Sequence, residues 1–251
     1  MYTLKKSLGQ HFLKDEGVCR KIVDALAAQP FERLLEVGPG GGALTSHLLQ
    51  LKGIDFKCVE VDDEKVQYLL KTWPQLAGHI IHASILDIEP PFEGMFTVVG
   101  NFPYNISSQI LFKVLDWKAQ TECMIGMFQK EVAQRIVARE GSKVYGVTSV
   151  LIQAFFTAEY LFEVGEEAFT PPPKVKSAVI RLKPVSSPLA MKTEKQFFQL
   201  VKAAFNQRRK MLRNAVKGLF DAETLQDEIF NKRAEQLSVQ QFAALTFRMN
   251  Y

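Results

Sequence analysis

A glycine-rich turn between an apolar segment and a helical one constrains the fold of this chain more than any other feature. Residues 33–37 have the pattern of a short buried strand, and Gly38-Pro39-Gly40-Gly41-Gly42 follows directly. The pattern of residues 43–49 then predicts a helix. Glycine in such a turn lets the backbone approach a ligand closely, where a side chain would collide. The segment predicts an α/β fold with a nucleotide-type site at the turn, and a purely structural turn is the alternative.

The next predicted strand, residues 56–60, ends in the carboxylate of Glu60. Nucleotide-binding α/β folds use an acid at this place to hydrogen-bond the two ribose hydroxyls. The turn lacks the third glycine of the dinucleotide fingerprint, and Pro39 removes a backbone donor, which suits a thioether amino acid better than a pyrophosphate. The Glu-Val-Gly-Pro-Gly sequence accordingly resembles motif I of S-adenosylmethionine-dependent methyltransferases.

The third predicted strand, residues 78–83, leads into Ser84-Ile85-Leu86-Asp87. Methyltransferases of this type usually have Asp after the third strand, where it contacts the adenine amino group. Ser84 stands at that position here. Three interpretations stay open: the Ser84 hydroxyl accepts from the amine, Asp87 does so, or the adenine contact is weaker.

Asn101-Phe102-Pro103-Tyr104 follows an apolar run at residues 95–100, where a buried strand should end and a rigid turn begin. The Asn101 amide is both donor and acceptor, Pro103 restricts the turn, and Tyr104 offers a flat face to a planar substrate. The amide carbonyl and a neighbouring backbone carbonyl can accept both N–H bonds of an exocyclic amine. The segment resembles the Asn-Pro-Pro-Tyr and Asn-Leu-Pro-Tyr motifs of DNA and RNA amino-methyltransferases. A proline turn with a packed tyrosine is the alternative.

Further segments extend the resemblance over nearly the whole chain, in the order in which one family has them. With the motif at Asn101 they identify the chain as a member of the ribosomal RNA adenine dimethyltransferases. The small-subunit enzymes are more similar to it than the erythromycin-resistance methylases, which share the first domain. The matching segments are residues 7–13 (with His11 in place of the common Asn), 101–107, 127–133, 145–146, 168–179 and 204–212.

The resemblance implies a fold, an activity and partners. The expected fold is α/β: a Rossmann-like S-adenosylmethionine-dependent methyltransferase sheet with helices on both faces, in residues 1–184, plus a small C-terminal all-α RNA-binding domain in residues 189–251. The expected activity is dimethylation at N6 of two adjacent adenosines in small-subunit rRNA, by a monomer acting on a 30S-type pre-ribosomal particle. A large-subunit methylase of the antibiotic-resistance type and a non-catalytic assembly factor are the alternatives.

The resemblance also assigns site residues. The tyrosine and a late phenylalanine of the family face each other across the target base, so Tyr104 and Phe169 are expected to clamp it and recover stacking energy of about 1–3 kcal/mol. Core packing is the alternative for Phe169. The residues expected to hold the target base are Asn101, Phe102, Pro103, Tyr104 and Phe169. Those expected to bind S-adenosylmethionine are His11, Leu13, Gly38, Gly40, Glu60, Ser84, Asp87 and Asn101.

Beyond a predicted linker at residues 184–188, apolar residues recur at helical spacing over 197–205 and again over 211–219. Basic residues gather on and between these helices and are expected to bind phosphates of structured RNA. A solvated basic helix face is the alternative. The residues assigned to RNA are Lys202, Arg208, Arg209, Lys210 and Arg213.

The cysteines and histidines of the sequence give no indication of a disulfide framework or a metal site. Cys19, Cys58 and Cys123 are scattered and odd in number, which argues for reduced thiols and a cytoplasmic location. The four histidines lack zinc-type spacing, so no metal is expected. No segment approaches the roughly twenty apolar residues of a membrane span, so no membrane association is expected.

Overall fold

The computed structural model describes residues 11–250 of the chain, and it contains two compact units. Within the described residues, the first unit comprises residues 11–133 together with Glu159–Pro184, and the second comprises Gln134–Ala158 and residues 185–250. The step from Pro184 to Val185 lies at the start of the predicted linker. Residues 134–158 fall in the second unit, whereas the sequence places them in the first domain; Arg208 donates hydrogen bonds to their loop, at Lys143 O (2.6 Å).

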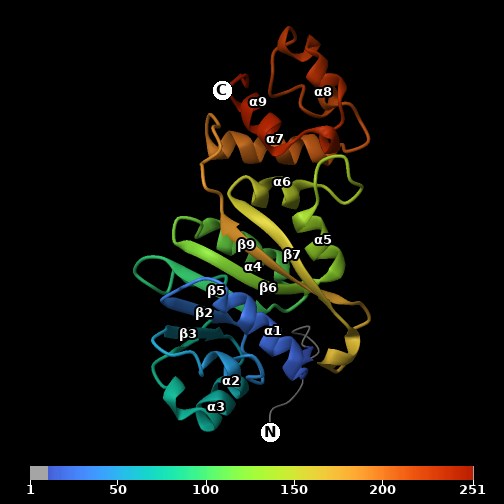
Figure 1. Cartoon of the computed structure of the whole chain (residues 1–251). Helices are drawn as coiled ribbons and strands as arrows, with labels where there is room; N and C mark the ends of the chain where they lie inside the picture. Colours follow the sequence, from blue (N-terminus) through green and yellow to red (C-terminus); the bar gives the residue numbers. More distant parts are fainter. Residues whose placement is uncertain (1–10, 251) are drawn as a thin grey trace. The chain divides into compact units, whose positions relative to one another are not determined.

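A seven-stranded sheet forms the first unit as far as the described residues show, with the strand order β4-β3-β2-β5-β6-β9-β7 (Figure 1). Strands β4, β3, β2, β5 and β6 pair in parallel, and β9 pairs antiparallel with β6. The strands are β2 Arg33–Val37, β3 Asp55–Glu60, β4 Ile80–His82, β5 Phe96–Asn101, β6 Thr121–Gln129, β7 Phe156–Val164 and β9 Ser177–Pro184.

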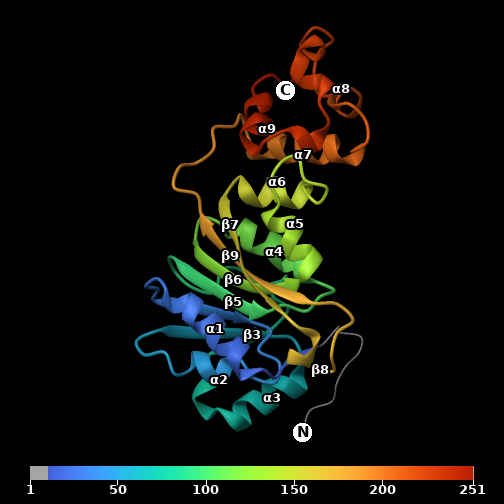
Figure 2. The same ribbon diagram turned by 45° about the vertical axis from the view of Figure 1, so that its right-hand side comes forward.

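Helices cover both faces of this sheet, and α1 and α4 lie on opposite sides of it (Figures 1 and 2). Strand β5 is buried at every position but its last, as expected of a parallel strand covered on two faces. Helix α1 begins directly after Asp15, whose carboxylate caps it by accepting from Gly17 N and Val18 N. The helices are α1 Glu16–Ala27, α2 Thr45–Leu48, α3 Asp63–Thr72, α4 Ser107–Asp116 and α5 Lys130–Val137, with short 3₁₀ turns at Pro74–Leu76 and Glu166–Ala168.

The strand order brings the sequence motifs to one edge of the sheet. The chain runs outward from β2 through β3 to β4 and then returns to β5 on the other side of β2. Because β2, β3 and β5 are parallel, their carboxyl ends at Val37, Glu60 and Asn101 lie along the same edge. A reversal of strand order of this kind opens a crevice at the carboxyl edge, which is the usual ligand site of open α/β sheets.

A separate two-stranded sheet joins segments that are far apart in the sequence. Strand β1 (Phe12–Leu13) pairs antiparallel with β8 (Phe169–Thr170), in the register Phe12 with Thr170 and Leu13 with Phe169. Lys14 N also donates to Ala168 O at 2.9 Å. The segment that precedes α1 is thereby fixed against the segment that leads into the three prolines.

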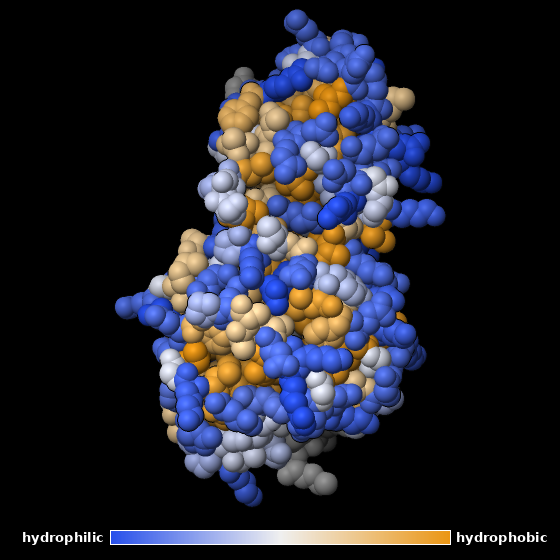
Figure 3. Space-filling view, in the orientation of Figure 1, coloured by the Kyte–Doolittle hydropathy of each residue, from blue (hydrophilic) through white to orange (hydrophobic). Residues whose placement is uncertain are grey.

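The second unit is helical. The helix predicted over residues 197–205 is α7 (Glu194–Asn206), capped by the Thr193 side chain, but the helix predicted over 211–219 is only α8 (Leu212–Ala215). Gly218 falls inside the predicted span, and glycine disfavours a helix interior. The surface over α8 is mostly hydrophilic (Figure 3). The unit also contains α6 Val147–Gln153, α9 Val239–Thr246 and 3₁₀ turns at Thr224–Gln226, Glu228–Asn231 and Ala234–Gln236.

Candidate functional site

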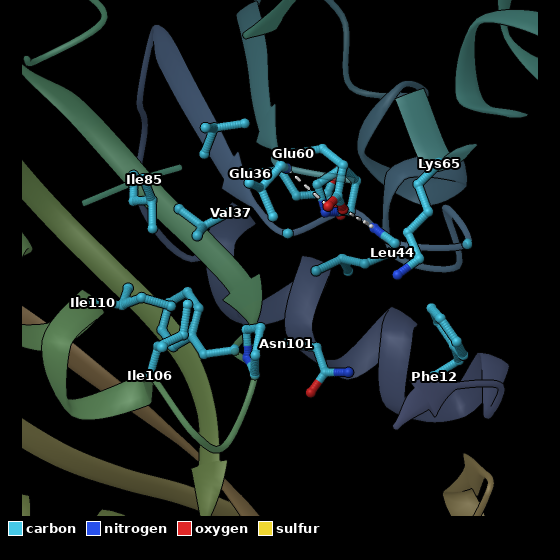
Figure 4. Close-up of a pocket in the computed structure, with 18 of the residues that line it drawn as sticks. Phe12, Glu36, Val37, Leu44, Glu60, Lys65, Ile85, Asn101, Ile106 and Ile110 are labelled. Atoms are coloured by element: carbon cyan, nitrogen blue, oxygen red, sulfur yellow. Dashed lines mark hydrogen bonds between the residues drawn. The ribbon is translucent and has the colours of Figure 1, made fainter. Parts of the chain in front are cut away.

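A cavity opens at the carboxyl edge of β2, β3 and β5, where the sequence motifs converge (Figure 4). Strand β1 closes one side of it through His11, Phe12 and Leu13. Asp87 and Phe169 are the two predicted site residues of the first unit that do not line it. The predicted residues that do are His11, Leu13, Gly38, Gly40, Glu60, Ser84, Asn101, Phe102, Pro103 and Tyr104; residues 7–10 of the N-terminal motif lie outside the described residues.

The glycine turn has the backbone conformation that its sequence requires. Gly38 and Gly40 have φ values of 68° and 57°, a region that residues with a side chain rarely adopt. A Cβ atom on Gly40 would also lie 3.1 Å from the Phe12 ring. Gly38 N donates to Val59 O at 2.9 Å, so the turn is bonded to the adjacent strand β3.

Backbone N–H groups hold the Glu60 carboxylate in a single orientation. One oxygen accepts from Gly40 N at 3.1 Å, and the other accepts from Val61 N at 2.9 Å and Asp62 N at 3.0 Å. Charge-assisted bonds of this kind are stronger than bonds between neutral groups. The carboxylate therefore lies fixed at the cavity wall, which suits an acceptor for two neighbouring hydroxyl groups.

Glu36 is a buried acid that the sequence analysis did not single out. It lies in β2 just before the glycine turn, lines the cavity, and accepts a 2.7 Å hydrogen bond from the Thr45 hydroxyl. Burial raises the pKa of Glu36 to about 8, the Thr45 bond opposes this, and the nearby Glu60 adds to it. The sequence offered one signal for a functional role of Glu36, since it is the first residue of the Glu-Val-Gly-Pro-Gly motif.

A buried lysine joins α3 to strand β1. Lys65 is 1% exposed, and its Nζ lies 3.7 Å from an Asp62 carboxylate oxygen and 4.9 Å from the centre of the Phe12 ring. A cation over an aromatic face is attracted to it. Lys65 therefore holds β1 at the cavity wall, and Figure 4 shows its side chain directed toward the part of the site where Phe12 lies. No sequence pattern marked it, because the contact joins residues 53 positions apart.

Phe102 anchors the substrate motif in the core. Its ring is 1% exposed and meets the Phe128 ring edge-on at 5.2 Å. It lies in a slot beside Gly100 and Gly126, and a Cβ atom on either glycine would collide with it. Phe102 N also donates to Met127 O at 3.3 Å. The two glycines, neither of which the sequence analysis identified as functional, let the motif sit close to the sheet.

Asn101 and Tyr104 are held by different neighbours. Asn101 Nδ2 donates to the backbone oxygen of His11 at 3.1 Å. The Tyr104 and Ser177 hydroxyls are hydrogen-bonded at 2.6 Å, and the Tyr104 and His11 rings lie 5.3 Å apart with their planes inclined by 31°. Burial raises the pKa of the Tyr104 phenol above its usual value, so the phenol stays neutral near pH 7.

Phe169 belongs to the hydrophobic core in this structure. Its ring is 1% exposed and packs in a cluster with Leu13, Met127 and Val179. The ring that faces Tyr104 is that of His11. The clamp of Tyr104 and Phe169 across a target base stays a prediction.

Ser84 and Asp87 differ in their relation to the cavity. Ser84 lines it, and its Oγ accepts from Leu86 N at 3.2 Å. A hydroxyl oxygen with one such bond can still accept a second hydrogen and donate its own. Asp87 is exposed and lies outside the lining. Of the alternatives for an adenine contact, the geometry favours Ser84.

The basic residues of the second unit fall into two groups. Arg208 is bonded within its own unit, where Nη2 donates to Ser142 O at 3.3 Å and to Lys143 O at 2.6 Å, and Nε lies 3.9 Å from Glu235. Lys202, Arg209 and Lys210 are exposed, and Arg213 is half-buried. The exposed residues can bind phosphates, whereas Arg208 holds the loop of residues 141–143.

Within residues 11–250, no group of three or more His, Cys, Asp or Glu side chains is arranged to hold a metal ion. The same residues contain no helix with both the length and the apolar character needed to cross a bilayer.

Comparison with known proteins places this geometry among ribosomal RNA methylases. The family described as "Ribosomal RNA adenine dimethylase" matches residues 1–250. The protein named "Ribosomal RNA small subunit methyltransferase A" from Cytophaga hutchinsonii is 52% identical over 246 residues, which cover 96% of this chain and 95% of that protein. The protein of the same name from Parabacteroides distasonis is 51% identical over 96% of this chain and 92% of its own length.

Solved structures show the same fold at lower identity. A dimethyladenosine transferase from Plasmodium falciparum has a TM-score of 0.82 and 23% identity, over 96% of this chain and 100% of that one. The 23S rRNA methyltransferase ErmE has a TM-score of 0.71, also at 23% identity, over 96% and 100% of the two chains. The predicted fold, a Rossmann-like methyltransferase sheet with an all-α C-terminal part, is thereby confirmed.

Proposed function

Because the chain belongs to the ribosomal RNA adenine dimethylase family, we propose that it transfers methyl groups from S-adenosylmethionine to the N6 amines of two adjacent adenosines in small-subunit rRNA. The observation that carries this proposal is that the Asn101 amide, at the tip of β5, lines the same cavity as the fixed carboxylate of Glu60. An acceptor for an exocyclic amine and an acceptor for a ribose thus lie in the same site.

The residues of the cavity fit S-adenosylmethionine. Glu60 would accept from the ribose hydroxyls, the turn at Gly38 and Gly40 would lie against the amino acid part, and Ser84 would meet the adenine edge. His11 and Leu13 of β1 would close over the cofactor. The bound cofactor supplies a methyl group on a positively charged sulfur. Transfer of that methyl group leaves a neutral thioether.

Orientation is the main task of the enzyme, because the sulfonium gives up its methyl group as a neutral thioether leaves, and the alkylated amine then loses its N6 proton easily to water without a dedicated base. The Asn101 Oδ1 atom and the Phe102 carbonyl would each accept a hydrogen bond from one N–H of the adenine amine. This would turn the lone pair of the amine toward the methyl group. Tyr104, held by Ser177, would set the plane of the base. Placing the reacting atoms in line at near-attack distance can lower the activation barrier by several kcal/mol. A singly methylated amine keeps one N–H for one acceptor, so a second transfer is feasible.

The second unit would bind the RNA of a 30S-type particle, with the protein acting as a monomer. Lys202, Arg209, Lys210 and Arg213 would contact phosphates, which give affinity that depends on salt and reads shape more than sequence. Two alternatives are a large-subunit methylase and a non-catalytic assembly factor. The 52% identity to a small-subunit methyltransferase favours the first assignment, and the intact Asn101 and Tyr104 favour an active enzyme.

The test is incubation of the purified protein with labelled S-adenosylmethionine and unmethylated small or large ribosomal subunits, followed by nucleoside analysis. We expect dimethyladenosine in small-subunit RNA alone. Asn101→Ala should abolish transfer and leave cofactor binding detectable. Label in large-subunit RNA, or no methylated adenosine in either, would reject the proposal, and full turnover by Asn101→Ala would reject the role of that amide.

A further inference from the structure

The orientation of the Asn101 amide decides whether it can hold the target amine. An amide has an acceptor on one side and two N–H donors on the other. If the nitrogen faced the adenine amine, two donors would meet and the amine could not be held. The two orientations of the group differ by a half-turn of its terminal torsion, so something in the protein must select one.

The selecting group is the backbone carbonyl of His11. Asn101 Nδ2 lies 3.1 Å from it. A carbonyl oxygen can only accept, so the amide nitrogen must face it, and Oδ1 lies on the other side of the group. Figure 4 shows the nitrogen of Asn101 turned toward the segment that carries Phe12.

The His11 side chain fixes the place of that carbonyl. Its Nδ1 lies 2.8 Å from Pro171 O, another atom that can only accept, so Nδ1 carries the hydrogen. The pairing of Phe12 with Thr170 continues this attachment into the two-stranded sheet. One residue therefore bonds to Pro171, directly after β8, through its ring and to the substrate motif through its backbone.

We propose that His11 is the positioning residue of the amine site: its Nδ1–H bond to Pro171 holds the His11 carbonyl against Asn101 Nδ2 and thereby directs Oδ1 to the target adenine. This inference rests on the proposed function and adds the residue that selects the amide orientation. Loss of the ring's bond frees the carbonyl and lets the amide turn. The methyl acceptor is then held in a smaller fraction of encounters, while the glycine turn and Glu60 are unaffected.

Two substitutions of equal polarity separate this role from packing. The side-chain nitrogen of Asn lies close to where Nδ1 of His lies, whereas the nitrogen of Gln lies one bond further out. His11→Asn can donate to Pro171 O, and His11→Gln cannot do so from the same backbone position. The net contribution of one hydrogen bond corresponds to about tenfold in an equilibrium.

The first measurement is single-turnover methyl transfer to unmethylated small subunits with saturating cofactor. We expect His11→Gln to lower the rate by about tenfold and His11→Asn to restore it to within about threefold of the parent. Because His11 lines the cofactor cavity, the affinity for S-adenosylhomocysteine is measured separately by calorimetry. We expect it to fall by a similar factor in the two variants, because each replaces the ring that lines the cavity, so every rate is taken at a cofactor concentration that saturates that variant.

The second measurement needs no substrate. In protein labelled with ¹⁵N at asparagine, the side-chain amide signal of Asn101 is identified by its loss in Asn101→Ala. We expect the signal to keep its position in His11→Asn and to shift, with faster hydrogen exchange, in His11→Gln.

Equal transfer rates in the two variants, or an unshifted Asn101 signal in His11→Gln, would overturn the inference. So would a loss of cofactor affinity confined to His11→Gln, since the defect would then lie in cofactor binding. These results leave the proposed function standing as long as the parent forms dimethyladenosine and Asn101→Ala does not. A parent that methylates no adenosine overturns both.

Discussion

Protonation of Glu36 should make the stability of this protein depend on pH in one direction. The pKa of the folded carboxyl is about 8, against an ordinary value of 4.5. Between these values the folded chain keeps a proton that the unfolded chain has lost. The free energy of unfolding therefore falls as pH rises across this window and levels off above about pH 8.

The magnitude follows from the size of the shift. Each pKa unit corresponds to about 1.4 kcal/mol, so Glu36 alone costs roughly 4 kcal/mol of stability between pH 5 and pH 8. Glu36→Gln replaces the acid with a neutral side chain of the same shape that can still accept from the Thr45 hydroxyl at 2.7 Å. The variant should match the parent near pH 5 and exceed it increasingly toward pH 8.

The assay is urea unfolding of parent and variant at half-unit steps from pH 5 to pH 9, with the difference in free energy plotted against pH. Titrating groups that lie away from Glu36 are common to both proteins and cancel in that difference. The Cys19 thiol does feel the Glu36 charge, but its pKa is raised, chiefly by burial, to about 12, so it stays neutral over this range in both proteins. Thr45→Val is the matched control, because loss of its hydrogen bond raises the pKa of Glu36 further and moves the curve to higher pH. Parallel curves for the parent and Glu36→Gln would show that Glu36 is ionised in the fold and would refute the reasoning.

Three further predictions test other parts of the molecule. Ser84→Asp should tighten S-adenosylhomocysteine binding by about fivefold in calorimetry, since a charged acceptor bonds an amine more strongly than a hydroxyl; unchanged or weaker binding would place the adenine elsewhere. Gly126→Ala should lower the free energy of unfolding by about 1–3 kcal/mol, because its Cβ would collide with the buried Phe102 ring and lie 2.8 Å from a ring carbon of Phe128. An unchanged free energy of unfolding in urea would show that Phe102 is not packed this closely against Gly126. Charge reversal at Arg209 and Lys210 should weaken particle binding mainly at low salt and leave thermal unfolding unchanged, whereas Arg208→Ala should lower the unfolding temperature; the reverse pattern would exchange their roles.

The parts of the site that lie at strand ends were predictable from the sequence. The pattern of residues 33–37 matched β2 over its full length, because the apolar residues Leu34, Leu35 and Val37 are followed at once by a glycine-rich turn. Once β2, β3 and β5 are taken as parallel neighbours, Gly38, Glu60 and Asn101 must lie along one edge. Local sequence thus determined both the strands and the order in which their ends carry ligand residues.

Contacts between distant segments were not predictable in the same way. The bond from Asn101 to the carbonyl of His11 joins residues 90 positions apart, and no periodicity records a backbone acceptor. Arg208 was assigned to RNA with its basic neighbours, because charge in a sequence does not tell whether a guanidinium faces solvent or a carbonyl of its own chain.

The substrate motif is supported from two sides that should fail in different ways. On the sheet side, the Phe102 ring fills the slot beside Gly100 and Gly126, and a side chain placed in that slot must displace the core. A substitution in the slot should reduce the free energy of unfolding and the rate of transfer together. On the other side, the His11 carbonyl next to strand β1 holds the Asn101 amide with one hydrogen bond. A substitution there should reduce the rate of transfer in a protein that still folds. The hydrogen bond next to β1 selects the reactive orientation of the amide, whereas the buried core of the sheet stabilises the fold.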